Sequence, residues 1–327
     1  MSEPLVTIIT PCYNGEKYLK YYFDSILSLN YSNLELIFVN DGSCDNTEEV
    51  VKSYECALKK RKIRFYYIFQ ENAGQARAMN NAFKYMHGKY LVWPDSDDFL
   101  TPDSIKIRVC FMEENPSYDM IRSNGMYFDF DSREVLYRIS NSENLRNEDI
   151  FLDLILEKTY CACGCYMIRV SKFKDIYPDL QIFESRAGQN WQILIPMAGR
   201  SKCAYIDENQ YYIAIRKNSH SRKEYTEEEQ IKRFLQLKDI LLNGILLSGR
   251  NDHDYKKIVE SKYNHILMNY YLDKKDKKNA QLYFCRLKKE NDLTDGDIRR
   301  YLILQNYFVY ILYRVKFFVK HRILKSK

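Results

Sequence analysis

Four times within its first hundred residues, a short apolar run of this chain ends in a polar loop. The runs are rich in β-branched and aromatic residues, as strands are, and cover residues 5–10, 34–39, 63–69 and 90–93. Segments with helical spacing of apolar side chains follow the first three runs, within residues 18–29, 47–54 and 75–86. Strands that alternate with helices form a parallel sheet with crossover helices on its faces. The alternation therefore predicts an α/β fold with a mainly parallel sheet flanked by helices.

The fourth run ends in three carboxylates, Asp95, Asp97 and Asp98. Like charges this close repel, and their burial costs free energy unless a cation or strong donors compensate. A divalent metal with oxygen ligands would compensate, and phosphate oxygens commonly complete its coordination. The alternative is a solvated acidic turn, because residues 101–103 are typical of a helix start. Ligands of open α/β sheets bind at the carboxyl ends of the strands, so the four loops are expected to converge on one crevice.

The loops carry motifs in a fixed order: Pro11-Cys12-Tyr13-Asn14, Val39-Asn40-Asp41-Gly42-Ser43, Asn72-Ala73-Gly74 with Asn80, and Asp95-Ser96-Asp97-Asp98. This series resembles the successive motifs of family-2 glycosyltransferases, which are nucleotide-sugar enzymes of the GT-A fold. The resemblance covers residues 4–110 motif by motif and continues more loosely to residue 221. It implies a GT-A glycosyltransferase domain over residues 1–221, with a mixed, mainly parallel sheet.

The resemblance also implies which residues bind the nucleotide. In the first loop Pro11, Tyr13 and Asn14 should contact it, with Tyr13 as a stacking face, although ordinary packing is the alternative in a chain with 29 tyrosines. Asp41 matches the aspartate that accepts from the imide N–H of the base, although Asp-Gly also favours a simple turn. The other implied contacts are Asn72 and Gly74 in the third loop, Arg77 in place of the arginine that many members carry at Met79, and Asp95 and Ser96.

A divalent cation, Mn²⁺ or Mg²⁺, is the implied cofactor. Asp97 and Asp98 match its ligands, and Asp97 is therefore also an implied catalytic residue, because the ion neutralises charge on the departing diphosphate. Residues 211–221 resemble the segment that ends the catalytic domain. Within it, Arg216 and His220 are candidates for phosphate and metal contacts, with a surface strand and loop as the alternative.

The chain departs from the family at Gln189-Asn190, where most members carry Glu-Asp. That aspartate is the family's catalytic base, and an inverting transfer needs one to deprotonate the acceptor hydroxyl. Amides cannot accept that proton, but they can bind sugar hydroxyls. Gln189, Asn190 and Trp191 are therefore predicted to bind the acceptor, although Trp191 fits a helix core almost as well. Glu184 is the closest carboxylate in sequence and the candidate base; a base from elsewhere, or lost activity, remains open.

These observations predict a glycosyltransferase that moves a hexosyl or N-acetylhexosaminyl group from a UDP-sugar to a carbohydrate acceptor. A lipid-linked acceptor in capsule or exopolysaccharide synthesis is the implied setting. The alternative function is a catalytically impaired nucleotide-sugar binding protein, which residues 189–190 motivate. A nucleotidyltransferase is disfavoured because the sequence contains no basic Gly-rich loop for a triphosphate.

The sequence after residue 221 predicts helices. Thr226 and Glu229 form a capping box at the start of a helical extension over residues 222–298, and Lys238 interrupts its apolar stripe. Residues 299–327 hold eight Lys or Arg and no acid, interleaved with aromatic residues. This composition predicts a basic amphipathic tail helix on an anionic membrane surface. A tail docked on its own domain is the alternative; nucleic acid is a rival partner that nothing else in the sequence supports.

The nine cysteines show no paired spacing typical of zinc sites. Cys161, Cys163 and Cys165 alternate, which predicts buried thiols on one face of a strand. Residues 1–10 lack the basic start and apolar core of a secretory signal. We therefore expect a cytoplasmic protein that lies peripherally on the inner face of the cell membrane.

Overall fold

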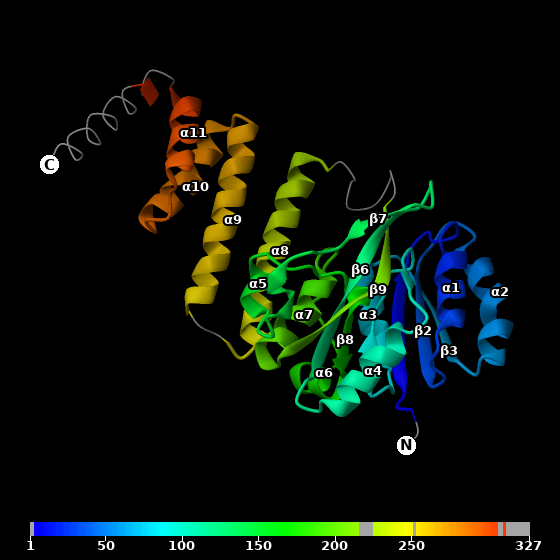
Figure 1. The fold of residues 1–327 in the computed structure, drawn as a ribbon. Helices are drawn as coiled ribbons and strands as arrows, with labels where there is room; N and C mark the ends of the chain where they lie inside the picture. Colours follow the sequence, from blue (N-terminus) through cyan, green and yellow to red (C-terminus); the bar gives the residue numbers. More distant parts are fainter. Residues whose placement is uncertain (1–2, 216–224, 251–252, 307–309, 312–327) are drawn as a thin grey trace. The chain divides into compact units, whose positions relative to one another are not determined.

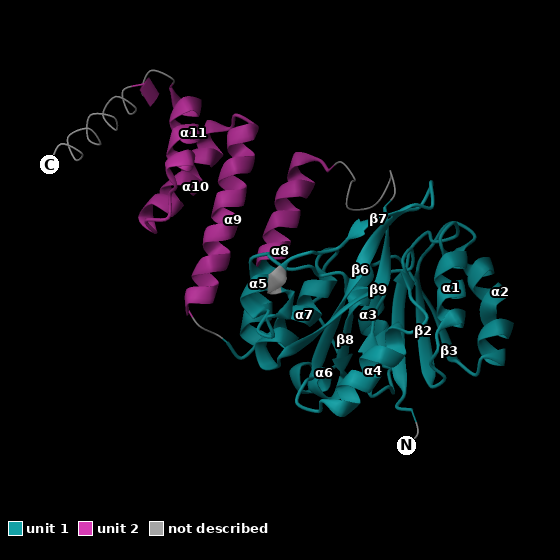
Figure 2. Ribbon diagram, viewed as in Figure 1, with its two compact units in different colours: residues 1–224, 239–251 teal, residues 225–238, 252–327 magenta. Residues whose placement is uncertain are grey.

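The computed structural model describes residues 3–215, 225–250, 253–306 and 310–311 of the chain. Figure 2 shows that the chain divides into two compact units. Unit 1 comprises residues 1–224 and 239–251, and unit 2 comprises residues 225–238 and 252–327. In the described residues, unit 1 contains the whole β-sheet and unit 2 is helical (Figure 1).

The first half of unit 1 alternates strands with helices. Its strands are β1 (Val6–Cys12), β2 (Leu34–Asp41), β3 (Arg64–Gln70) and β4 (Tyr90–Val92), and its helices are α1 (Leu19–Ser28), α2 (Thr47–Lys60) and α3 (Gln75–Phe83). The strands pair in parallel in the order β3-β2-β1-β4. Every residue of β1 and β2 is buried, as expected for central parallel strands covered on both faces. The predicted α/β alternation is confirmed.

The second half of unit 1 extends the same sheet. Its elements are β5 (Phe99–Leu100), α4 (Ser104–Glu114), β6 (Met120–Asp129), β7 (Val135–Arg138), the 3₁₀ helix η1 (Glu143–Arg146), α5 (Phe151–Ile155), the 3₁₀ helix η2 (Cys163–Cys165), β8 (Tyr166–Arg169), α6 (Val170–Ile176), α7 (Gln189–Arg200) and β9 (Cys203–Ile215). β8 runs antiparallel to β4 and β6, whereas β9 runs parallel to β6. The sheet is therefore mixed, with most of its paired residues in parallel ladders.

One segment differs in type from the prediction. Residues 163–165 form η2 and not a strand, and β8 begins only at Tyr166. The chain passes closely over the ring of Tyr211 here, because a Cβ added to Gly164 would lie 2.1 Å from that ring. Cys163 and Cys165 are buried free thiols.

Unit 2 contains part of α8 (Glu227–Leu247) with α9 (His253–Asp273), α10 (Lys277–Lys289) and α11 (Asp295–Gln305). The predicted capping box of α8 is present: Thr226 N donates to Glu229 Oε2 at 2.8 Å, and Glu229 N donates to Thr226 Oγ1 at 3.3 Å. Lys238, which interrupts the apolar stripe, pairs with Glu260 of α9 at 3.3 Å. The charge in the stripe thus has an opposite charge beside it.

The predicted domain boundaries at residues 221 and 298 stay predictions, since the compact units divide the chain at residues 224, 238 and 251. The second half of α8 belongs to unit 1, where a Cβ added to Gly244 would lie 3.0 Å from Ile195 Cγ2 of α7. α11 begins with a capping box between Thr294 and Asp297, so position 299 lies inside a helix. Most of the predicted tail, residues 307–309 and 312–327, lies outside the described residues. Of the helices that are described, none has the length and apolar character needed to cross a membrane.

Candidate active site

The sheet directions bring the predicted site loops to one edge. β1, β2, β3 and β4 run parallel, and β6 shares their direction because β8 is antiparallel to both β4 and β6. The loops that follow these strands therefore leave from the same edge of the sheet, where α/β proteins bind their ligands.

Hydrogen bonds join the loops after β1 and β2. Asn14 N donates to Ser43 Oγ at 2.9 Å, and Cys44 N donates to Asn14 Oδ1 at 2.8 Å. Asn14 has a φ of 53°, in the left-handed region that asparagine tolerates. Tyr13 is 41% exposed, so its ring can stack on a ligand, whereas Pro11 is a buried residue of β1.

The carboxylate of Asp41 organises the loop after β3. Asp41 is only 3% exposed. Its Oδ1 accepts from Gln70 Nε2 at 2.7 Å and from Ala73 N at 2.8 Å. Its Oδ2 accepts from Gly74 N at 2.9 Å and, over a longer 3.4 Å, from Asn72 Nδ2. A carboxylate offers about four lone-pair sites, so protein donors occupy nearly all of its capacity.

Close backbone contacts hold the same loop on both sides. Gly42 has a φ of 70°, and a Cβ added there would lie 2.6 Å from Asn72 N. Gly74 has a φ of 93°, and an added Cβ would lie 3.3 Å from Arg186 Cγ. Arg186 Nη1 also donates to Asn72 Oδ1 at 3.1 Å. A larger residue at position 42 would therefore displace the loop that contacts Asp41, and one at position 74 would strain the backbone and push on the Arg186 side chain.

The segment between α6 and α7 is hydrogen-bonded to α3, the helix that follows the loop after β3. Asn80 of α3 exchanges two hydrogen bonds with the backbone of Ile182, at 2.9 and 2.8 Å. Two residues further on, Glu184 Oε1 lies 4.0 Å from Arg77 Nε, and both side chains are more than half exposed. An exposed pair at this distance contributes little stability. The structure thus places Glu184, the candidate base, beside Arg77, which is predicted to bind the nucleotide. The carboxylate of Glu184 is exposed to solvent.

Tyr211 of β9 holds the acidic turn after β4. Its hydroxyl donates to Asp98 Oδ2 at 2.7 Å and accepts from Asp95 N at 3.1 Å, while Ala214 N donates to Asp98 Oδ1 at 2.8 Å. Asp98 is 4% exposed, and burial, with the Asp95 charge adding to it, raises the pKa of its carboxyl. Both Asp98 oxygens serve the protein's own donors. Asp98 stays a predicted metal ligand, and Asp97, which is half-buried, is the more accessible candidate.

Asp95 and Asp97 are suited to a hard divalent cation that takes few protein ligands. Among the described residues, no group of three or more His, Cys, Asp or Glu side chains could hold a metal ion by itself. Mg²⁺ and similar ions are commonly held by one or two carboxylates plus phosphate oxygens and water, which matches Asp97 with Asp95 beside it. His220 and Arg216 lie outside the described residues. Cys163 Sγ donates to Asp95 Oδ2 at 3.4 Å, and burial raises the pKa of this thiol, which keeps it protonated.

The predicted acceptor residues begin α7. Trp93 Nε1 donates to Asn190 Oδ1 at 3.0 Å, which ties the first turn of α7 to the end of β4. Asn190 therefore orients a buried tryptophan, a role that the sequence analysis missed. Gln189 and Trp191 are half-buried, so neither side chain is fully part of the core. The binding and catalytic roles of all the site residues stay predictions.

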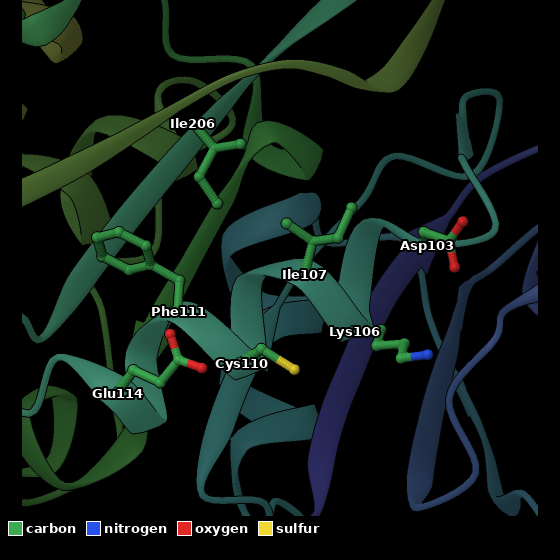
Figure 3. A pocket seen from close by; sticks show the side chains of 7 residues that line it. All are labelled: Asp103, Lys106, Ile107, Cys110, Phe111, Glu114 and Ile206. Atoms are coloured by element: carbon green, nitrogen blue, oxygen red, sulfur yellow. The ribbon is translucent and has the colours of Figure 1, made fainter.

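A separate hollow lies on the surface of α4 (Figure 3). One face of this helix and Ile206 of β9 form it, and its lining consists of Asp103, Lys106, Ile107, Cys110, Phe111, Glu114 and Ile206. It borders none of the loops after β1, β2 and β3 and contains no predicted site residue. We therefore do not include it in the candidate site.

Residues 7–177 match the family described as glycosyl transferase family 2, and the chain belongs to this family. An uncharacterized glycosyltransferase of Rickettsia prowazekii is 33% identical over 166 residues, which is 51% of this chain and 50% of that protein. The chain thus spans about half the length of this relative.

Two solved structures share the fold. Residues 1–349 of S. aureus TarS in complex with UDP-GlcNAc align with a TM-score of 0.57 and 18% identity, covering 91% of this chain and 79% of that one. A mannosyltransferase from Pyrobaculum calidifontis in complex with GDP-Man and Mn²⁺ aligns with a TM-score of 0.52 and 14% identity, covering 95% and 87%. Together with the family match, these alignments confirm the predicted GT-A-like fold.

Proposed function

We propose that this protein transfers a sugar from a UDP-sugar to a hydroxyl of a carbohydrate acceptor. The observation that carries the proposal is the cluster of contacts at the carboxyl edge of the sheet. There the Asp41 carboxylate anchors the loop after β3, and the acidic turn follows β4. A nucleotide base and a metal-bound diphosphate need these two kinds of group, an acceptor for an imide N–H and a carboxylate that can bind the metal.

The proposed cofactor is Mn²⁺ or Mg²⁺, held by Asp97 with Asp95 beside it. When bound, such an ion neutralises the charge that develops on a departing diphosphate. The tyrosine at position 211 supports this role, because its hydroxyl holds both the Asp95 backbone and the Asp98 carboxylate and so sets the shape of the turn. The mannosyltransferase complex with GDP-Man and Mn²⁺ shows that a protein of this fold binds a donor and a metal together.

Glu184 is the proposed general base of an inverting transfer. Its exposed carboxylate would take the proton of the acceptor hydroxyl as that oxygen attacks the anomeric carbon. The bond from the sugar to the diphosphate then breaks, and UDP leaves. Gln189, Asn190 and Trp191 are proposed to bind the acceptor, and the transferred group is proposed to be a hexosyl or N-acetylhexosaminyl unit.

A second candidate function is a nucleotide-sugar binding protein without transferase activity. Asn190 favours it, because an amide stands where most family members carry the catalytic aspartate, and its oxygen already accepts from Trp93. Donor binding would be the same under both functions. Only turnover distinguishes them.

A panel of nucleotide sugars separates the two functions. We expect calorimetry to detect binding of UDP-glucose, UDP-galactose or their N-acetylamino forms in the presence of Mn²⁺, and little binding after chelation with EDTA. We also expect release of UDP from the bound donor, at least slowly by hydrolysis. Binding without any release of UDP would support the second candidate, and the failure of every UDP-sugar to bind would overturn the first.

We further propose that the acceptor is lipid-linked, in capsule or exopolysaccharide synthesis, and that residues 299–327 bring the protein to an anionic membrane surface. Because α11 runs to Gln305, truncation after Asn306 removes six of the eight basic residues of the tail without cutting α11. We expect the full chain, but not the truncated one, to sediment with vesicles that contain anionic lipid. Binding should weaken as salt rises, since the Debye length is only about 8 Å at physiological ionic strength. Equal sedimentation of both proteins would contradict the proposal.

A further inference from the structure

Both ends of the Gln70 side-chain amide are engaged. Its Nε2 donates to Asp41 Oδ1 at 2.7 Å, and its Oε1 accepts from Asn81 Nδ2 of α3 at 2.6 Å. Asn81 Oδ1 in turn accepts from Lys84 Nζ at 3.4 Å. The three residues form a directed chain of donors from Asn81 through Gln70 to the Asp41 carboxylate. A reversed Gln70 amide would place its oxygen against the carboxylate and its nitrogen against the Asn81 donor, and both contacts would be repulsive.

This chain fixes which Asp41 oxygen remains available to a ligand. Oδ1 accepts two short hydrogen bonds, from Gln70 Nε2 and Ala73 N. Oδ2 accepts one short bond, from Gly74 N, and the weaker contact from Asn72 Nδ2 at 3.4 Å. The outer lone pair of Oδ2 is thus the position that an incoming N–H can take most readily. Asn72 can yield it, because its Nδ2 also donates to the Asp41 backbone oxygen at a shorter 3.0 Å.

We propose that Gln70 and Asn81 are positioning residues that set the base specificity of Asp41. The proposal rests on the proposed function, in which the ligand is a nucleoside diphosphate sugar. The favoured base carries an imide N–H, as uracil does, whereas cytosine has only a lone pair at that ring nitrogen. With Gln70 in place, Oδ2 meets the base edge as a pure acceptor, which attracts uracil and repels cytosine. Without Gln70, Oδ1 keeps only the hydrogen bond from Ala73 N, so the carboxylate is held less firmly, Oδ2 is placed less accurately for the imide N–H, and discrimination falls.

The test compares UDP with CDP and with N3-methyl-UDP, in which a methyl group replaces the imide hydrogen. Dissociation constants are measured by calorimetry in Mg²⁺ buffer for the parent protein and for Gln70→Ala, Asn81→Ala and Asn115→Ala. Asn115 is the matched control: it is a half-buried amide at the end of α4 whose Nδ2 donates to Phe111 O at 2.9 Å, and it has no part in the chain of donors. Thermal unfolding of each variant reports its stability separately.

We expect the parent and Asn115→Ala to bind UDP at least about tenfold more tightly than either analogue, the value of one hydrogen bond to a charged group. In Gln70→Ala and Asn81→Ala this ratio should fall towards one, mainly because UDP binding weakens. A purely structural role would lower the unfolding temperature and weaken all three ligands equally. An unchanged ratio in folded Gln70→Ala, or a parent protein that binds UDP without discrimination, would overturn the positioning role. Failure of the parent to bind any of the three ligands would instead overturn the proposed function.

Discussion

Asp97→Asn is expected to abolish most metal-dependent donor binding and to lower turnover roughly 10²–10³-fold, as does the loss of one electrostatic contact at a developing charge. An amide keeps the shape of the side chain but lacks the negative charge that a hard cation requires. Asp98 should compensate only in part, because it is buried and both of its oxygens already accept from Tyr211 and Ala214. Calorimetry with UDP in Mn²⁺ and in EDTA, together with initial rates, measures both effects.

Two variants serve as comparisons for Asp97→Asn. Asp179→Asn removes an exposed carboxylate of the segment after α6 and should bind UDP and Mn²⁺ like the parent. Asp98→Asn should chiefly lower the unfolding temperature. Both carboxylate oxygens accept hydrogen bonds, and the amide nitrogen that replaces one of them would face a donor. Metal-dependent UDP affinity that is unchanged in Asp97→Asn would remove Asp97 from the metal site.

Glu184→Gln is expected to lower transfer by about 10²-fold or more, the usual range for a lost general base, while donor affinity stays unchanged. The substitution keeps the size of the side chain and removes only its ability to accept a proton. The carboxylate is more than half exposed and lies 4.0 Å from Arg77 Nε, so its loss leaves no buried charge behind. Initial rates with saturating donor, and calorimetry with UDP, separate the catalytic effect from binding.

Glu55→Gln, an exposed glutamate of α2, is the matched control for this measurement and should retain parental rates. A Glu184→Gln protein that transfers sugar as fast as the parent would show that another group takes the proton. An active parent together with an equally active Glu184→Gln variant would point to another carboxylate near α7 as the base. A parental protein that binds UDP-sugar but never turns it over makes Glu184 irrelevant and favours the binding-protein function.

Much of the site was predictable because its residues lie next to strand ends along the chain. Asp41 is the last residue of β2, and Asp95 follows β4 closely, so a correct assignment of strands already places both at the same edge. The strands themselves are marked by continuous apolar runs, which the parallel ladders bury on both faces. The strand predicted around Cys163 is wrong, because alternation of three small cysteines does not reveal how closely the chain passes over Tyr211.

The sequence alone predicts the order of strands and helices in the first half of unit 1 and the four loops at one edge of its sheet. These features depend on side-chain periodicity and on turn residues, which act over a few neighbouring positions. The partners of individual polar groups, in contrast, follow from the three-dimensional packing. Asp98 meets Tyr211 across 113 residues, Trp93 meets Asn190 across 97, and Gln70 meets Asp41 across 29. A buried carboxylate or amide takes its role from the donor or acceptor that packing brings to it, and no local pattern encodes that partner.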